Sequence, residues 1–145
     1  IISGQVDAVI GAYRNFELNQ MDINGRPGRA FFLEEEGVPA YDELIVVAHA
    51  ERLGDRRLKR FVDALEAAAQ FLVNHPKEGW ALFIKSHKDL NNELNKRAFR
   101  DTLPRFALRP AALDQGRYRR MAQFLKDQGL IKSVLGIDNY AVELQ

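Results

Sequence analysis

A polar and aromatic pentapeptide near the start of the chain has side chains that could bind a flat, nitrogen-rich ligand. Tyr13 has a ring that can stack on a heterocycle, and Glu17 has a carboxylate that can accept strong hydrogen bonds from an exocyclic amine. Arg14 adds a guanidinium, and the amide of Asn15 can both donate and accept. The segment 13–17 therefore predicts a small-molecule site. The alternative is a connecting loop whose rings fill the core and whose charges face water.

Other clusters of reactive side chains do not match a catalytic or metal-binding pattern. The chain has no G-x-S-x-G, H-E-x-x-H, P-loop or G-x-G-x-x-G motif, and it has no cysteine. His49, His75 and His87 include no i, i+4 pair, so we expect polar loop residues rather than metal ligands. The glutamates at 34–36 are expected to form a solvated loop. The arginines within 117–120 are expected to lie on the solvent-exposed face of a helix. We expect no catalytic residue, metal or cofactor.

The candidate site follows a predicted strand. The run 5–13 is short, apolar and bounded by glycine, which is typical of a buried parallel strand. In open α/β sheets ligands bind outside the carboxyl ends of strands, which is where residues 13–17 fall. Further strands are predicted at 29–33 and 41–48, and a short one at 140–144.

Four helices are predicted from the helical spacing of apolar residues after position 55. They are expected to begin after Asp55, at Pro76, after Asp89 and after Asp114, and to stop at Pro76, before Pro104 and at Gly129. The fold class is therefore α/β. Three short strands and a terminal one cannot easily cover four amphipathic helices, so sheet partners are expected outside the chain. The start without Met also indicates a fragment or a trimmed product.

Charge and composition exclude several classes of protein. The chain has 145 residues, 21 Lys and Arg and 20 Asp and Glu, so its net charge is +1. Nucleic-acid-binding proteins usually show a clear basic excess, so we expect no nucleic-acid partner. No apolar run approaches the ~20 residues that span a bilayer. The 46% hydrophobic content suits one ordinary soluble domain.

Two motifs in the same order resemble the thiamine-pyrimidine-precursor group of substrate-binding proteins. They are GAYRNFE at 11–17 and EGVPAYDEL at 36–44. A third pattern also fits this group, and it comprises residues 105–107, Asp114, Tyr118 and residues 129–131. Bacterial members of this group bind formylaminopyrimidine for an ABC importer. Eukaryotic relatives make the hydroxymethylpyrimidine phosphate of thiamine. The resemblance covers nearly the whole chain.

The resemblance implies a two-lobed, type II periplasmic-binding-protein fold with the ligand in the cleft, of which this chain is the C-terminal half. Residues 1–28 would be the end of one lobe and the crossover, and residues 29–145 the returning strands and C-terminal helices. The implied partners are the missing N-terminal half, an ABC transporter permease and a small-molecule pyrimidine. The implied location is periplasmic, or membrane-anchored and extracytoplasmic. Half of a two-lobed protein would expose apolar surface, so we expect a homodimer, a swapped assembly or poor stability for these 145 residues alone.

The resemblance also assigns ligand-binding roles to Tyr13, Arg14, Asn15 and Glu17. Glu17 would hold the aminopyrimidine edge, Tyr13 would line or stack on the ring, and Asn15 would add hydrogen bonds. Many characterised members have Trp at the position of Arg14. Because Arg favours an anion, a binder of a small anionic solute such as a sulfonate or nitrate is one alternative. The other alternative is an enzyme, the pyrimidine synthase, whose cysteine-rich iron motif and donor histidine lie mostly in the other half.

Overall fold

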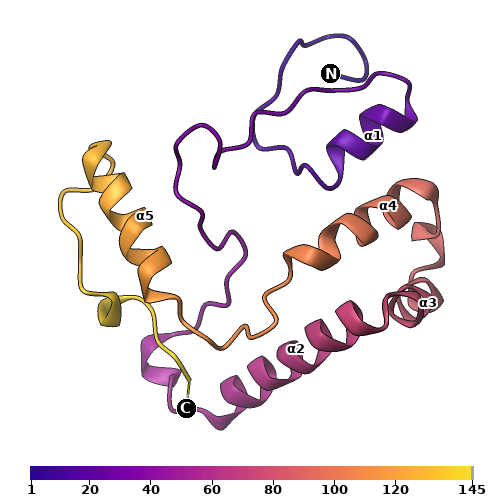
Figure 1. Cartoon of the computed structure of the whole chain (residues 1–145). Helices are drawn as coiled ribbons and strands as arrows, with labels where there is room; N and C mark the ends of the chain where they lie inside the picture. Colours follow the sequence, from indigo (N-terminus) through magenta and orange to yellow (C-terminus); the bar gives the residue numbers. More distant parts are fainter. Residues whose placement is uncertain (145) are drawn as a thin grey trace. The chain divides into compact units, whose positions relative to one another are not determined.

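The computed structural model describes residues 1–144, and the regular structure in that range is helical (Figure 1). The α-helices are α1 (Glu17–Ile23), α2 (Arg56–Asn74), α3 (Pro76–Ser86), α4 (Glu93–Thr102) and α5 (Gln115–Asp127). Four short 3-10 helices lie at Ala50–Arg52, Lys88–Leu90, Leu103–Arg105 and Ile137–Asn139. The four helices predicted after position 55 are present as α2 to α5. The helix α1 was not predicted.

The chain divides into two units, each formed by segments distant in sequence. Unit 1 comprises Ile1–Ala30 and Ala67–Leu108, and unit 2 comprises Phe31–Glu66 and the chain from Arg109 onward. The helix α2 begins in unit 2 and ends in unit 1. The assignment of residues 1–28 to the end of one lobe stays a prediction.

The predicted strands at 5–13, 29–33, 41–48 and 140–144 are not present in the described part of the chain, so the prediction of an α/β fold is wrong for these residues as they stand. A strand exists only when its N–H and C=O groups pair with those of a neighbour. β-branched composition favours an extended backbone, but it cannot supply that neighbour. The large apolar side chains of the segments 5–13 and 41–48 are consequently exposed, with Ile10 fully exposed and Leu44 86% exposed.

The start of α2 is set by Asp55, as predicted. One oxygen of its carboxylate, Oδ1, accepts a hydrogen bond from the backbone N–H of Arg57 at 2.9 Å, which satisfies one of the unpaired donors of the first turn. The Arg57 guanidinium also donates to this carboxylate and lowers the pKa of Asp55 to about 2. At the other end, His75 separates α2 from α3, and Pro76 occupies the first turn of α3.

The predicted cap of α4 was wrong, because Asn92 rather than Asp89 fills that position. Asp89 lies in the 3-10 turn Lys88–Leu90, whereas Asn92 has an extended backbone and accepts from the N–H of Asn95 at 2.9 Å. Asn is as good an N-cap as Asp, so the residue type alone could not favour Asp89 over Asn92. The prediction that this helix stops before Pro104 is confirmed, since α4 ends at Thr102.

Both predicted boundaries of α5 are confirmed. The Asp114 carboxylate accepts from the N–H of Arg117 at 2.9 Å. At the other end Gly129 has a φ of +71°, which a residue with a Cβ adopts only under strain. That conformation lets the N–H of Leu130 donate to the carbonyl of Leu125 at 2.9 Å and closes the helix.

Unit 1 is held together by aromatic rings and one close helix contact. The ring centroid of Trp80 lies 5.4 Å from that of Phe99, and Phe83 lies 6.4 Å from the same ring. Gly79 is buried where α3 approaches α2, and a Cβ there would stand 2.5 Å from Cδ2 of Leu72. The glycine thus permits the close approach of α3 to the end of α2.

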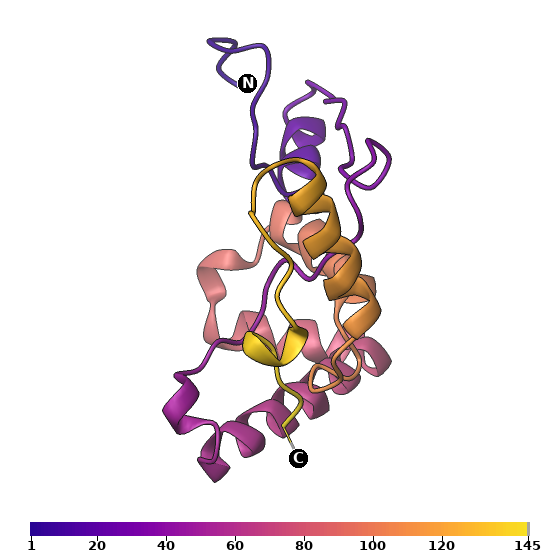
Figure 2. The ribbon, with the colours of Figure 1, turned by 90° about the vertical axis from the view of Figure 1, so that its left-hand side faces the viewer.

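Unit 2 has fewer packed elements. Val62 of α2 and Ile137 of the last 3-10 helix are its buried apolar side chains among the described residues. In Figure 2, α5 leads through coil to that 3-10 helix. The rings of Tyr118 and Tyr140 pack together there, with centroids 6.2 Å apart.

The small buried core predicts that the 145 residues associate in solution. Val62, Ala98 and Ile137 are the apolar side chains that the described structure buries, whereas residues 44–47 each expose half or more of their apolar surface. Exposed apolar surface of this extent promotes association. Sedimentation velocity is expected to show species larger than a monomer whose proportion rises with concentration. A single compact monomer with a cooperative melt that is independent of concentration would contradict this.

None of the helices within residues 1–144 has the length and apolarity that crossing a membrane requires.

Candidate functional site

The segment 13–17 forms a closed turn that leads into α1. The carbonyl oxygen of Tyr13 accepts from the N–H groups of Phe16 and Glu17, at 3.0 and 2.9 Å. In return, Oε2 of Glu17 accepts from the backbone N–H of Tyr13 at 2.6 Å. The backbone of Tyr13 is therefore bound on both sides. Phe16 occupies the N-cap without a side-chain hydrogen bond, so this reciprocal pair is what organises the start of α1.

The helix α1 ends in a glycine turn, which gives the segment a fixed exit. Gly25 has a φ of +65°, and the N–H of Arg26 donates to the carbonyl of Met21 at 3.0 Å. The chain then passes Gly28, where a Cβ would lie 2.7 Å from the sulfur of Met21. A side chain at this position would push against the side of α1.

Two hydrogen bonds join the chain at residues 15–19, which includes the first turn of α1, to the end of α4, more than 80 positions away in sequence. The amide nitrogen of Asn15 donates to Oγ1 of Thr102 at 2.6 Å, and that of Asn19 donates to Oδ2 of Asp101 at 2.8 Å. All four side chains are partly buried. The two asparagines lie four residues apart on one face of the segment, and their partners are adjacent at the end of α4.

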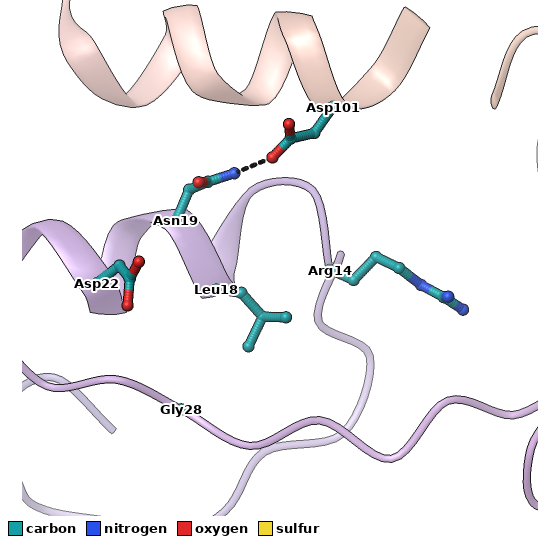
Figure 3. Close-up of a pocket in the computed structure, with 6 residues that line it drawn as sticks. All are labelled: Arg14, Leu18, Asn19, Asp22, Gly28 and Asp101. Carbon is teal, nitrogen blue, oxygen red and sulfur yellow. Dashed lines mark hydrogen bonds between the residues drawn. The ribbon is translucent and has the colours of Figure 1, made fainter. Parts of the chain in front are cut away.

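A pocket of about 320 Å³ lies beside this contact (Figure 3). It is lined by Arg14, Leu18, Asn19, Asp22, Gly28 and Asp101. The volume reaches the lower end of the range of small-molecule sites. In Figure 3 the Asn19–Asp101 hydrogen bond crosses between α1 and α4, and the side chain of Arg14 extends away from that pair.

The four predicted site residues lie next to one another but do not all face the pocket. Arg14 lines it, while the carboxylate of Glu17 is turned back to the backbone of Tyr13. The Tyr13 side chain is exposed, and the Asn15 amide points to Thr102. The ligand-binding roles of these four residues stay predictions.

Sequence reasoning missed the residues that hold this segment in place, namely Asn19, Asp101 and Thr102. The spacing of Asn15 and Asn19 was a usable signal, because two amides at i, i+4 share a helix face and favour a polar contact. Nothing in the sequence near Asp101 indicated that it would supply the partner, because the two segments are more than 80 residues apart.

The Asp101 carboxylate is an acceptor for two donors. Arg100 Nε lies 2.8 Å from Oδ1, and Asn19 Nδ2 lies 2.8 Å from Oδ2. These hydrogen bonds, with that of Arg100 the larger cause, lower the pKa of Asp101 below its ordinary value. The structure therefore favours the ionised form, which can accept but not donate.

This lowered pKa predicts an acid-sensitive stability. The unfolded Asp101 carboxyl binds a proton more readily than the folded one, so its stabilising contribution is present above pH ~4 and is lost as the pH falls through the folded pKa. We expect the urea midpoint of the wild type to fall more steeply below pH 4 than that of Asp101→Asn. Parallel curves for the two proteins between pH 6 and pH 2.5 would show that Asp101 has no such role.

In unit 2 the second motif of the sequence meets α5. The guanidinium of Arg117 pairs with the Asp42 carboxylate, and its Nε lies 3.7 Å from Asp114. Arg117 is therefore half-buried and paired, which corrects the expectation that it lies on the wet face with Arg119 and Arg120. Burial is the main cause that raises the pKa of the neighbouring Tyr118, with the Asp42 charge second.

The histidines have separate local roles. His49 accepts from the N–H of Glu51, His75 stacks on Phe71 and His87 stacks on Phe83. No three acidic or histidine side chains gather as a metal site would require anywhere in residues 1–144.

Comparison with known proteins identifies the family. A family model described as NMT1/THI5 like matches residues 1–79, which is more than half of the chain. The chain therefore belongs to the NMT1/THI5-like family, and the resemblance found in the sequence is confirmed. No solved structure matches it.

Two curated relatives agree with this assignment. A Haemophilus influenzae protein named "Putative thiamine biosynthesis protein" is 49% identical over 147 residues, which cover 100% of this chain and 46% of the relative. A Halalkalibacterium halodurans protein named "Formylaminopyrimidine-binding protein" is 31% identical over 94 residues, or 63% of this chain and 28% of the relative. The chain spans about half the length, or less, of the curated relatives it matches.

Proposed function

We propose that this chain is part of a solute-binding protein that captures a thiamine-precursor pyrimidine for an ABC importer and performs no reaction itself. The observation that carries the proposal is the segment 13–17, in which the Glu17 carboxylate closes a turn on the backbone of Tyr13 and the Asn15 amide is hydrogen-bonded to α4. A formylaminopyrimidine-binding relative is similar over 94 residues. The family membership supports the same class of ligand.

The chemistry of the segment suits an aminopyrimidine. The carboxylate of Glu17 has two oxygens and several acceptor positions, so its bond to the Tyr13 N–H leaves capacity for an exocyclic amine. The exposed ring of Tyr13 can stack on the flat heterocycle. Arg14, at the edge of the pocket, suits a ligand that also carries an anionic substituent.

The fold proposed for the whole protein is the two-lobed periplasmic-binding type, and its location is extracytoplasmic, either periplasmic or membrane-anchored. In such a fold the exposed segments 5–13 and 41–48 would pair as strands with chain beyond these residues. Their apolar, β-branched composition and their exposure in this structure support that pairing. The permease of the importer would be the protein partner.

The test is calorimetric titration of the full-length protein with formylaminopyrimidine. Saturable heat that a sulfonate or nitrate does not compete away supports the proposal. No heat with any pyrimidine, but binding of a small anion, would replace it with the anionic-solute function that Arg14 allows. Metal analysis of the same preparation separates the enzymatic alternative, because a pyrimidine synthase would contain iron. An iron-free protein that binds pyrimidine supports the solute-binding function.

A further inference from the structure

We infer that Asp101 and Thr102 are positioning residues of the pyrimidine site, and that they fix the amide of Asn15 so that its carbonyl oxygen is turned away from α4 and is left to accept from the ligand. The inference rests on the proposed function and deepens it, since it requires the ligand to present a hydrogen-bond donor to Asn15. The observations that carry it are the two hydrogen bonds between the α1 segment and α4.

The helix α1 needs such a support because it is weak alone. It has seven residues, no side-chain N-cap and no buried residue. Isolated helices shorter than ~12 residues are marginal in water, so its position depends on tertiary contacts. In the described part of unit 1, those contacts include the end of α4.

The hydroxyl of Thr102 decides which end of the Asn15 amide it meets. Its single proton is donated to the carbonyl of Ala98 at 2.7 Å. The oxygen can then only accept, so Asn15 must present its NH₂ group, and this contact is 2.6 Å. The Oδ1 atom of Asn15 is consequently the end of the amide directed away from α4.

Asp101 fixes the neighbouring amide by the same logic. Its ionised carboxylate can only accept, so Asn19 presents its NH₂ group to it. The Asn19 nitrogen also lies 3.0 Å from the backbone oxygen of Asn15. Asp101 therefore acts through Asn19 on the backbone of Asn15, while Thr102 acts on its side chain.

The consequence is a preference between two kinds of pyrimidine. An amino group meets the outward carbonyl of Asn15 as a donor, whereas an oxo group at the same ring position would set two acceptors against each other. A site built to bond a ligand N–H rejects the analogue that lacks it, because a partly buried polar group stays unpaired. If the side-chain amide of Asn15 can rotate by 180° and present its NH₂ group, the discrimination between the amino and the oxo pyrimidine is reduced.

The experiment compares Thr102→Val and Thr102→Ser in the full-length protein. Valine keeps the shape but cannot accept from Asn15, and serine keeps the hydroxyl. We expect Thr102→Val to bind formylaminopyrimidine about tenfold more weakly, while its affinity for the analogue with an oxo group in place of the amino group changes little. The amino-to-oxo preference should therefore fall about tenfold. Thr102→Ser should restore the preference. Glu93→Gln, on the exposed side of α4, is the control and should keep it.

Two outcomes overturn the inference. If Thr102→Val weakens both ligands equally, Thr102 has a structural role only. A ligand-free measurement separates this from failure of the proposed function: the side-chain NH₂ resonances of Asn15 and Asn19, which should be shifted and slow to exchange in the wild type. If the Asn15 NH₂ resonance loses its shift and slow exchange in Thr102→Val but not in Thr102→Ser, the hydrogen bond to Thr102 is supported. An unchanged Asn15 resonance in Thr102→Val refutes it. A wild type that binds no pyrimidine refutes the function and the ligand preference together.

Discussion

Glu17→Ala is expected to weaken the binding of formylaminopyrimidine by about 2–4 kcal/mol, which is roughly 30- to 1,000-fold in Kd. The carboxylate is the only anionic group within the segment 13–17, and truncation would leave the ligand amine without its charged acceptor. Calorimetric titration of the variant and the wild type measures the difference. A loss below ~0.5 kcal/mol, the size of an exposed pair, would place Glu17 outside the site.

Glu17 also has a structural role, so the experiment needs two further variants. Its Oε2 accepts from the N–H of Tyr13, and alanine removes that bond as well. Glu17→Gln keeps an acceptor for Tyr13 but removes the charge, so it should retain the turn and still lose most of the affinity. Glu35→Ala, in an exposed acidic loop, is the matched control and should bind like the wild type.

Phe99→Ala is expected to lower the free energy of unfolding by about 2–3 kcal/mol. The Phe99 ring of α4 packs against both Trp80 and Phe83 of α3, with centroid distances of 5.4 and 6.4 Å. Removing it deletes both ring contacts and opens a cavity beside the buried Gly79, whose position approaches the same ring. Urea denaturation measures the change.

Phe106→Ala is the matched control for this prediction. Phe106 belongs to the same unit but is 40% exposed, so its truncation should change the free energy of unfolding by less than about 0.5 kcal/mol. Equal effects of the two variants would mean that the aromatic contacts between α3 and α4 do not stabilise unit 1.

The features that could be predicted from the sequence were those that neighbouring residues determine. Asp114 caps α5 through an N–H three residues away, and Gly129 ends it through its own backbone conformation. The prediction that Asp89 caps α4 was wrong because Asn92, three residues later, has an equivalent capping side chain and an extended backbone. Between two good local candidates, the packing of the rest of the chain decides.

The strands could not be predicted from local sequence, because their existence depends on partners. The composition of 41–48 describes a preference for extended backbone, but hydrogen bonding to a neighbouring strand is a property of the whole sheet. The described residues contain no such neighbour for this segment.

The candidate site shows the same division. The residue types at 13–17 were visible in the sequence, and the structure ties Tyr13 and Glu17 together within that segment. The residues that orient it, Asp101 and Thr102, lie 82 and 87 positions from their partners Asn19 and Asn15. No local pattern encodes a contact at that separation.

The distance along the chain between Asn15 and Thr102 has a consequence for synthesis on the ribosome. The two residues are 87 positions apart, and ribosomes add roughly 5–20 residues per second. The segment that carries Glu17 therefore leaves the ribosome several seconds before the residues that hold it. A nascent chain stalled before Asp101 would carry every predicted ligand contact and still lack the order that binding needs. For this chain, translation sets the earliest moment at which the site can be competent.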